Sequence, residues 1–136
     1  MKLRFVIPLA AFPLFIFGCS KFGQQQKVAD PHVKEQDVKG GKKMVTSFYG
    51  RDFAGKKTAS GEIFQPALLT AAHRSLPFGT KLRLLNQDSG KSVEVSVNDR
   101  GPFIEGRDLD ISSGAASVLG MKEEGVTPLL VENLSR

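Results

Sequence analysis

Three short segments between residues 58 and 103 are richer in polar side chains than a stable fold requires. Their sequences are TASGE at 58–62, TAAHRSLPFGT at 70–80 and NDRGPF at 98–103. They contain carboxylates and a histidine, which are the side chain types that most often transfer protons in catalysis. Glu62, His73 and Asp99 are therefore the candidate catalytic residues.

Each of these candidates also has a purely structural interpretation. Asp99 ends an alternating stretch and precedes a Gly-Pro turn, so its side chain is expected at a strand end, but an aspartate there can also cap the turn. Glu62 follows a glycine in a polar loop, where a carboxylate can simply be solvated. His73 could hydrogen-bond to a carboxylate and tune its pKa, although a lone histidine is more often structural.

The segments that position these residues are mostly short β-strands. The stretch 92–98, SVEVSVN, alternates valine with polar residues, which indicates a strand with one buried face. With 81–86 and the Asp-Ser-Gly turn between them, it predicts a hairpin. Further strands are predicted at 45–49, 107–111 and 127–134, and at most one more within 53–69.

A short helix is predicted after 107–111. Ser112 or Ser113 can cap it, the apolar residues up to Leu119 continue it, and Gly120 ends it. About six short strands with one or two short helices predict a compact, mainly β barrel.

The N-terminus predicts export. Residues 1–18 combine two basic residues with an apolar run too short to span a bilayer, which is typical of a secretory signal peptide. Cys19 is the only cysteine and follows that run directly, so no internal disulfide explains it. The junction resembles the lipobox of bacterial lipoproteins, which implies lipidation of Cys19; the alternative is an ordinary signal with a free thiol. Ser20 resembles the default residue for outer-membrane sorting, which implies a lipid-anchored domain in the periplasm.

The charge distribution argues against nucleic acid as a partner. Residues 19–43 are polar and are predicted to be a flexible tether, so the barrel domain is expected at 44–136. The formal net charge of +5 lies in the signal and the N-terminal tether region, because residues 46–136 hold eleven basic and eleven acidic residues. A clustered basic face, which nucleic-acid binding requires, is not visible.

Five motifs in order and spacing resemble the rare lipoprotein A family over residues 46–134. They are SFYG at 47–50, TASGE at 58–62, TAAHRSLPFGTKLRL at 70–84, VNDRGPF at 97–103 and RDLDISSGAASVLGM at 107–121. The resemblance implies a six-stranded double-psi β-barrel, shared with expansins and some lytic transglycosylases. It also implies that peptidoglycan glycan strands, especially those lacking stem peptides, are the substrate.

The resemblance assigns roles to the candidate residues. A lytic transglycosylase cleaves the bond between MurNAc and GlcNAc with the sugar's own 6-hydroxyl as nucleophile, so one carboxyl group acts first as acid and then as base. Asp99 is the first choice for that group, supported by Glu62 and His73. The expected substrate-binding residues are Phe48, Tyr49, Thr58, Arg100 and Asp110.

Some of these roles have alternatives of their own. One residue of the pair Phe48 and Tyr49 must point into the core if the strand is regular. Arg100 could instead pair with a carboxylate, and Asp110 could have a structural role near the helix start.

The chain departs from the family pattern at two points. Phe48 stands where the family usually has tryptophan, and no C-terminal sporulation-related repeat is recognised. The competing functions are a non-catalytic glycan-binding or cell-division-associated outer-membrane lipoprotein and an interaction module for other wall enzymes. No metal or cofactor is expected, since the barrel segment contains one histidine, no cysteine and no phosphate-binding glycine loop.

Overall fold

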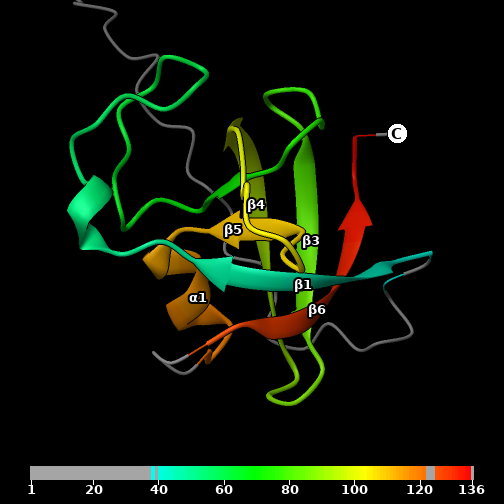
Figure 1. Cartoon of the computed structure of the whole chain (residues 1–136). Coiled ribbons are helices and arrows are strands. Elements are labelled where there is room, and N and C mark those ends of the chain that lie inside the picture. The colour runs from blue at the N-terminus through cyan, green and yellow to red at the C-terminus, as the bar shows by residue number, and fades with distance from the viewer. Residues whose placement is uncertain (1–37, 39, 122–124, 136) are drawn as a thin grey trace, which may run out of the picture.

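A computed structural model of the protein describes residue 38 and residues 40–121 and 125–135 (Figure 1). The predicted signal peptide at 1–18, Cys19 and most of the predicted tether at 19–43 lie outside these residues. None of the helices in the described part is long and apolar enough to cross a membrane.

Six strands close into a barrel in the order β1-β5-β2-β4-β3-β6 (Figure 1). The strands are β1 (Lys42–Phe48), β2 (Thr70–Ala72), β3 (Lys81–Asn86), β4 (Lys91–Asp99), β5 (Leu109–Ile111) and β6 (Thr127–Asn133). The pairs β1·β5 and β2·β4 are parallel and the other four are antiparallel. One α-helix, α1 (Ser113–Val118), and one 3-10 helix, η2 (Arg51–Phe53), accompany them. The predicted mainly β barrel with one or two short helices is confirmed.

The barrel interior is filled by the alternating faces of its long strands. Val93, Val95 and Val97 of β4 are fully buried, and Leu82 and Leu84 of β3 are buried with them. This is the period of two that the sequence showed, so the predicted hairpin is confirmed: β3 and β4 pair from Lys81↔Ser96 to Asn86↔Lys91. Burial of these apolar side chains is the main contribution to the stability of the barrel.

Three strand predictions need correction. Strand β2 (Thr70–Ala72) lies just beyond the segment 53–69 in which the extra strand was expected, because Thr-Ala-Ala has neither alternation nor large β-formers. Strand β1 begins at Lys42, so the pairing of Lys42 and Lys43 with β6 reaches into the predicted tether. Strand β5 begins at Leu109 rather than at Arg107.

Helix α1 begins and ends where the sequence predicts. The Ser112 hydroxyl accepts a hydrogen bond from the Ala115 N–H at 3.3 Å, which makes it the N-cap. Gly120, directly after the C-cap Leu119, has φ +65°, a conformation that glycine adopts without strain. The helix packs its buried face, Ala115 and Ala116, against the barrel core.

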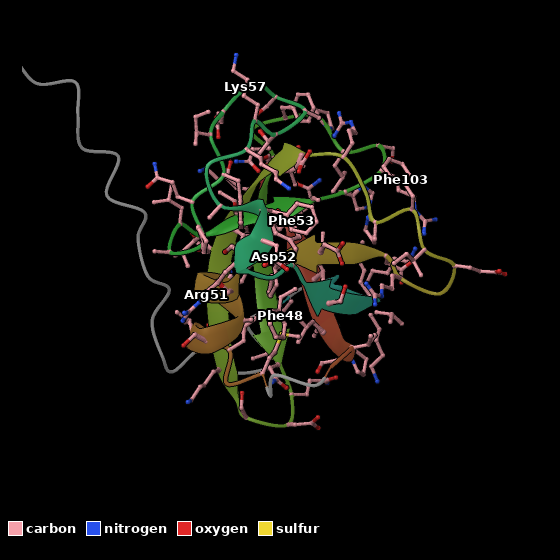
Figure 2. The ribbon with its side chains drawn as sticks, turned by 60° about the vertical axis from the view of Figure 1, so that its left-hand side comes forward. Phe48, Arg51, Asp52, Phe53, Lys57 and Phe103 are labelled. Carbon is pink, nitrogen blue, oxygen red and sulfur yellow. The ribbon has the colours of Figure 1, made fainter. Side chains whose placement is uncertain are left out.

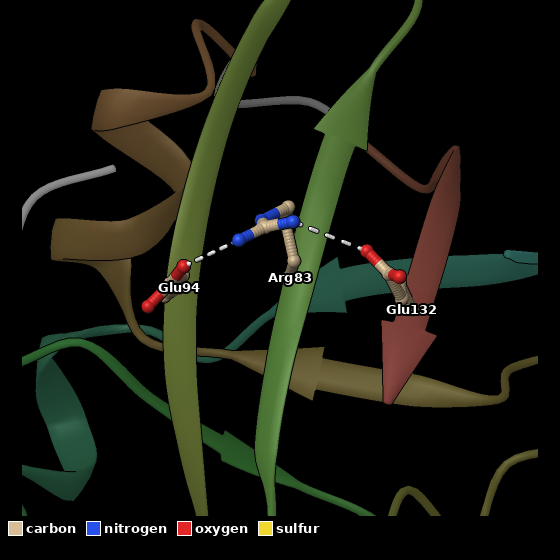
Figure 3. Close-up of polar contacts among 3 residues, drawn as sticks. All are labelled: Arg83, Glu94 and Glu132. Atoms are coloured by element: carbon tan, nitrogen blue, oxygen red, sulfur yellow. Dashed lines mark hydrogen bonds and ion pairs between the residues drawn. The ribbon is translucent and has the colours of Figure 1, made fainter. Parts of the chain in front are cut away.

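One ion-pair network crosses three strands on the outside of the barrel. The Arg83 guanidinium of β3 contacts Glu94 of β4 at 3.0 Å and Glu132 of β6 at 3.3 Å (Figure 3). These residues are also the strand-register partners of Arg83. Partly exposed pairs of this kind contribute about 0.2–1 kcal/mol each, so they support the register without determining it.

Helix α1 lies so close to the segment before β2 that one of its positions admits only glycine. A Cβ on Gly114 would lie 2.7 Å from the Ala67 carbonyl oxygen and 2.9 Å from that of Pro66. The Gly114 N–H also donates to the Pro66 carbonyl at 2.8 Å. The contact is with backbone on both sides, so no side chain can rotate away to relieve it.

We predict that Gly114→Ala destabilises the barrel by about 1–3 kcal/mol, the usual cost of overpacking. The gain of up to about 1 kcal/mol that alanine normally gives in a helix is smaller than this cost. Urea unfolding of the variant measures the change. Gly50→Ala is the control, because a Cβ there meets nothing within 4 Å and φ is −74°; equal stability of both variants would contradict the prediction.

Candidate active site

Two aspartates are brought together by the register of three adjacent strands. Ala72 of β2 is paired with Asp99 of β4 on one side and with Asp110 of β5 on the other. Ser47 of β1 is in turn paired with Asp110. Residues far apart in sequence therefore form one row, Ser47–Asp110–Ala72–Asp99, across the barrel wall. The bulge between Ala71 and Ala72 lies in this row.

Asp99 is held by hydrogen bonds from two loops. Its Oδ1 accepts from the Ala59 N–H at 2.9 Å and from the Arg100 N–H at 2.8 Å. Its Oδ2 has no hydrogen-bond partner among the described residues. One carboxylate oxygen thus fixes the orientation of the side chain, and the other remains available to a ligand.

Tyr49 and Asp110 complete the centre of the site. The Ser47 hydroxyl donates to Asp110 Oδ1, which fixes the second carboxylate. The Tyr49 hydroxyl is buried, lies near Thr70 and has no hydrogen-bond partner in the described structure. Burial raises the pKa of the Tyr49 phenol well above its ordinary value, and the nearby Asp99 and Asp110 carboxylates raise it further. Tyr49 is therefore a neutral phenol held beside the Thr70 side chain.

A pocket of about 450 Å³ lies over this centre, and Asp99, Asp110, Tyr49, Phe48 and Thr58 all line it. We call it the Asp99 pocket. Its other lining residues come from η2, the loop after η2, β2 and the loop that follows β4: Gly50, Phe53, Lys56, Lys57, Phe64, Ala72, Arg100, Gly101, Pro102, Phe103, Ile104 and Arg107. A volume of this size suits one or two sugar rings.

Exposed aromatic rings border the Asp99 pocket on two sides. Phe53 is 52% exposed and Phe103 is 80% exposed, and Figure 2 shows them apart from each other on this face. Phe53 packs edge-on against Tyr49, with ring centroids 6.1 Å apart, and Lys56 Nζ lies 5.2 Å from the Phe53 ring. Both rings present apolar surface to a ligand in the Asp99 pocket.

The structure shows how Phe48 and Tyr49 divide their roles. Strand β1 ends at Phe48, so strict alternation does not extend to Tyr49. Phe48 is half-buried and packs against the core cluster, as expected for one of the pair, yet it also lines the Asp99 pocket. Tyr49 packs against buried Phe64 with ring centroids 4.8 Å apart.

Glu62 lies next to Asp99 but does not line the Asp99 pocket. It is exposed, and its Oε2 accepts a hydrogen bond from Asn98 Nδ2 at 2.8 Å. The 58–62 turn is bound to the end of β4 through this contact and through the Ser60 N–H, which donates to the Asn98 carbonyl at 3.1 Å. Glu62 therefore contacts Asn98, the residue before Asp99 in β4, and makes no hydrogen bond to Asp99 itself among the described contacts.

His73 is fixed by a turn rather than by a carboxylate. Its Nδ1 accepts from the Ser75 and Leu76 N–H groups, each at 3.1 Å, and no described carboxylate hydrogen-bonds to it. Burial lowers the pKa of His73, and the neighbouring Arg100 and Arg74 guanidinium groups lower it further. The His73 N–H donates to the Asp99 carbonyl at 3.2 Å, so the histidine touches Asp99 through the backbone only.

Two arginines join the loops that follow β2 and β4. Arg100 Nη1 donates to the Leu76 carbonyl at 2.8 Å and to the His73 carbonyl at 3.3 Å, and its guanidinium carbon lies 3.9 Å from the Phe78 ring centroid. The structure thus assigns Arg100 a backbone-binding role instead of the carboxylate pair considered from the sequence, although it also lines the Asp99 pocket.

Arg74 makes the reciprocal contact and was not identified from the sequence. Its guanidinium donates to the carbonyls of Pro102 at 2.7 Å, Arg107 at 2.6 Å and Ile104 at 3.3 Å. These bonds hold the loop that carries Phe103. No sequence signal distinguishes Arg74 from a surface arginine, because its partners are backbone carbonyls. Phe53 and Lys56 were missed as well, since they lie in η2 and the loop after it, outside the recognised motifs.

Comparisons with known proteins agree on one family. A family model described as lytic transglycolase matches residues 42–131. A Nostoc protein named probable endolytic peptidoglycan transglycosylase RlpA is 57% identical over 94 residues, 68% of this chain and 25% of the relative. A Rickettsia bellii protein named endolytic peptidoglycan transglycosylase RlpA is 40% identical over 121 residues, 86% of this chain and 53% of the relative. The chain thus spans about a quarter to a half of the length of these relatives.

A solved structure supports the fold. The Streptomyces papain inhibitor SPI is similar with a TM-score of 0.53 and 19% sequence identity, covering 71% of this chain and 98% of the inhibitor. At this identity the likeness concerns the barrel alone. Within the described residues, no three histidine, cysteine or acidic side chains are grouped as a metal site would require.

The sole tyrosine of the chain allows a direct test of the site's electrostatics. Because burial and two neighbouring carboxylates oppose ionisation, we predict that Tyr49 titrates well above its ordinary pKa of 10.0. Ultraviolet absorbance of the phenolate against pH measures this. Urea-unfolded protein is the control and should titrate near 10.0; a midpoint near that value in the folded protein would contradict the buried arrangement.

The lowered pKa of His73 predicts a pH dependence of stability. Below its ordinary pKa of 6.5 the unfolded chain takes up a proton at this residue before the folded chain does. Stability is therefore lost as the pH falls from 6.5 toward the lower folded pKa, and it is fully present above 6.5. Protonation of Nδ1 would also remove the acceptor of the two N–H groups.

The matched variant is His73→Asn, whose Oδ1 can accept the same hydrogen bonds but does not titrate. We predict that urea unfolding between pH 7 and pH 5 shows a larger loss of stability in the natural chain than in the variant. Parallel profiles would show that His73 is free to protonate in the folded protein.

Proposed function

We infer that the chain cleaves peptidoglycan glycan strands, because it belongs to the RlpA family of lytic transglycosylases. The observation that carries this proposal is the carboxylate of Asp99, which faces an open pocket with one oxygen fixed and the other free. The proposed substrate is the β-1,4 bond between MurNAc and GlcNAc in strands lacking stem peptides.

The first step is proton donation to the leaving sugar. Asp99 Oδ2 has no described partner, so it is the oxygen that carries the proton and delivers it to the glycosidic oxygen as the C1–O bond breaks. The bond cleavage leaves positive charge on C1 and the ring oxygen of the MurNAc residue. The carboxylates of Asp99 and Asp110, which both line the pocket, stabilise this charge.

The second step returns the proton and closes the ring. Asp99 Oδ2, now unprotonated, accepts the proton from the 6-hydroxyl of the same MurNAc residue. The 6-oxygen forms a bond to C1, which gives a 1,6-anhydro end without consuming water. Because Ala59 and Arg100 hold Oδ1 by their N–H groups, Oδ2 occupies the same position in both steps.

The neutral Tyr49 phenol contributes to binding of the sugar substrate in this scheme. Its hydroxyl is buried beside the two aspartates and Tyr49 lines the Asp99 pocket, so a sugar hydroxyl or acetamido carbonyl in the pocket can accept a hydrogen bond from it. Phe53 and Phe103 add apolar faces for the sugar rings on either side.

Glu62 and His73 are assigned supporting roles. Glu62 orients Asn98, the residue before Asp99, through its hydrogen bond to Nδ2, and its exposed position lets it contact a strand that extends beyond the pocket. His73 shapes the turn that holds Arg100, and through Arg100 it helps to fix the loop after β4. His73 thus acts through Arg100, which lines the pocket, whereas Glu62 contacts the strand directly.

We also propose that the chain is a lipoprotein of the outer membrane with its barrel in the periplasm. The support is in the sequence: a basic start, an apolar run and the single cysteine at position 19. Anchoring by several acyl chains on Cys19 would keep the barrel near the cell wall. Mass spectrometry of the N-terminal peptide from membranes tests this proposal, and an unmodified Cys19 thiol or an uncleaved N-terminus would refute it.

We predict that Asp99→Asn lowers the rate of 1,6-anhydro product formation by at least about 10²–10⁴-fold, the usual contribution of a general acid. Asparagine keeps Oδ1 as an acceptor for the two N–H groups, so the fold is retained. The assay incubates the chain with peptide-free glycan strands and detects anhydro ends by mass spectrometry. Asp88→Asn, in the exposed turn between β3 and β4, is the matched control.

Two outcomes would redirect the proposal. Products with ordinary reducing ends would identify a hydrolase, in which water replaces the 6-hydroxyl. Binding of the strands without release of any product would identify a glycan-binding lipoprotein instead of an enzyme.

A further inference from the structure

A second pocket adjoins the Asp99 pocket and has no role in the scheme above. It measures about 610 Å³ and lies between η2, α1 and the segment before β2. Phe48 and Gly50 line both pockets, so the two meet at these residues. We call the second one the α1 pocket. A polymer bound over Asp99 therefore has a continuous path across Phe48 and Gly50 into it.

The floor of the α1 pocket is built rigidly. Ser113 Oγ donates to the Pro66 carbonyl at 3.3 Å and the Gly114 N–H donates to the same carbonyl at 2.8 Å. Contact between Gly114 and the backbone of Pro66 and Ala67 leaves no room for a Cβ. The pocket is thus present before a ligand arrives, which lowers the entropic cost of binding.

Among the described residues, Arg51 is the only charged side chain that lines the α1 pocket. No acidic residue lines this pocket in the described structure, and Arg51 makes no ion pair with a described residue. Asp52 is next along the chain but does not line the pocket. Figure 2 shows Arg51 beside α1, with Phe48 and Phe53 between it and Phe103. A guanidinium that has no acidic partner among the described residues favours a ligand that carries a carboxylate.

We propose that the α1 pocket is a second saccharide subsite, in which Arg51 binds the lactyl carboxylate of a muramyl residue of the strand. This inference rests on the proposed function, because it takes the occupant to be the same glycan that crosses Asp99. In a strand that carries stem peptides, the lactyl group is an amide and has no charge at that position. Arg51 then favours the peptide-free strand, whose lactyl group is a free carboxylate.

The test measures binding, so it does not depend on cleavage. The full chain carrying Asp99→Asn is titrated with peptide-free glycan strands and with the same strands after reduction of their carboxylates to alcohols. We expect Arg51→Gln to weaken binding of the carboxylate strands by about two- to fivefold, as for an exposed ion pair, and to leave binding of the reduced strands unchanged. Arg51→Lys should recover part of the loss, and high salt should remove the difference.

The control is Lys81→Gln, which removes one exposed cation from the start of β3, outside both pockets. Equal effects of Arg51→Gln on both kinds of strand, or no preference of the natural Arg51 for carboxylate strands, would overturn the proposal. If Arg51→Gln weakens binding of the carboxylate strands only, and the chain with its natural Asp99 cleaves no strand, the subsite proposal stands and the proposed enzymatic function is refuted. If the natural chain cleaves strands but binds carboxylate and reduced strands equally well, the enzymatic function stands and the subsite proposal is refuted.

Discussion

The site depends on a single carboxylate oxygen that ties three parts of the chain together. Asp99 stands at the end of β4, the longest strand, and its Oδ1 accepts hydrogen bonds from the Ala59 N–H in the 58–62 turn and from the Arg100 N–H in the loop after β4. Without this acceptor, two N–H groups at the pocket wall would lose their partner, and the turn carrying Thr58 would lose a contact with β4. Because Oδ1 has this structural role, Oδ2 is positioned for chemistry without any further support.

The barrel topology explains why such distant residues meet. Parallel pairing of β1 with β5 and of β2 with β4 places Ser47, Asp110, Ala72 and Asp99 in one row. The loops that leave these strands form the walls, and Arg74 and Arg100 bind backbone carbonyls across them. The strands therefore supply the carboxylates, and arginine contacts fix the loop that carries Phe103 beside them. This division suits a pocket that must hold a long, flat polymer in one register.

Part of this arrangement could be predicted from the sequence. The alternating valines of β4 and the serine–glycine boundaries of α1 are local signals, and both elements were located correctly. Strand β2 was not, because Thr-Ala-Ala becomes a strand only through burial between β4 and β5. The partners of His73 and Arg100 also escaped prediction, since both bind backbone groups, which the sequence does not distinguish. The catalytic and binding roles of the candidate residues remain predictions.

The central claim is that a glycan strand lies over Asp99 with its scissile oxygen at Oδ2. The most direct measurement is a crystal structure of the Asp99→Asn chain with a peptide-free glycan tetrasaccharide. The account predicts the bridging oxygen within hydrogen-bond distance of the residue 99 side chain and a sugar acceptor at the Tyr49 hydroxyl. A tetrasaccharide bound on another face, or one whose bridging oxygens all lie away from residue 99, would contradict it.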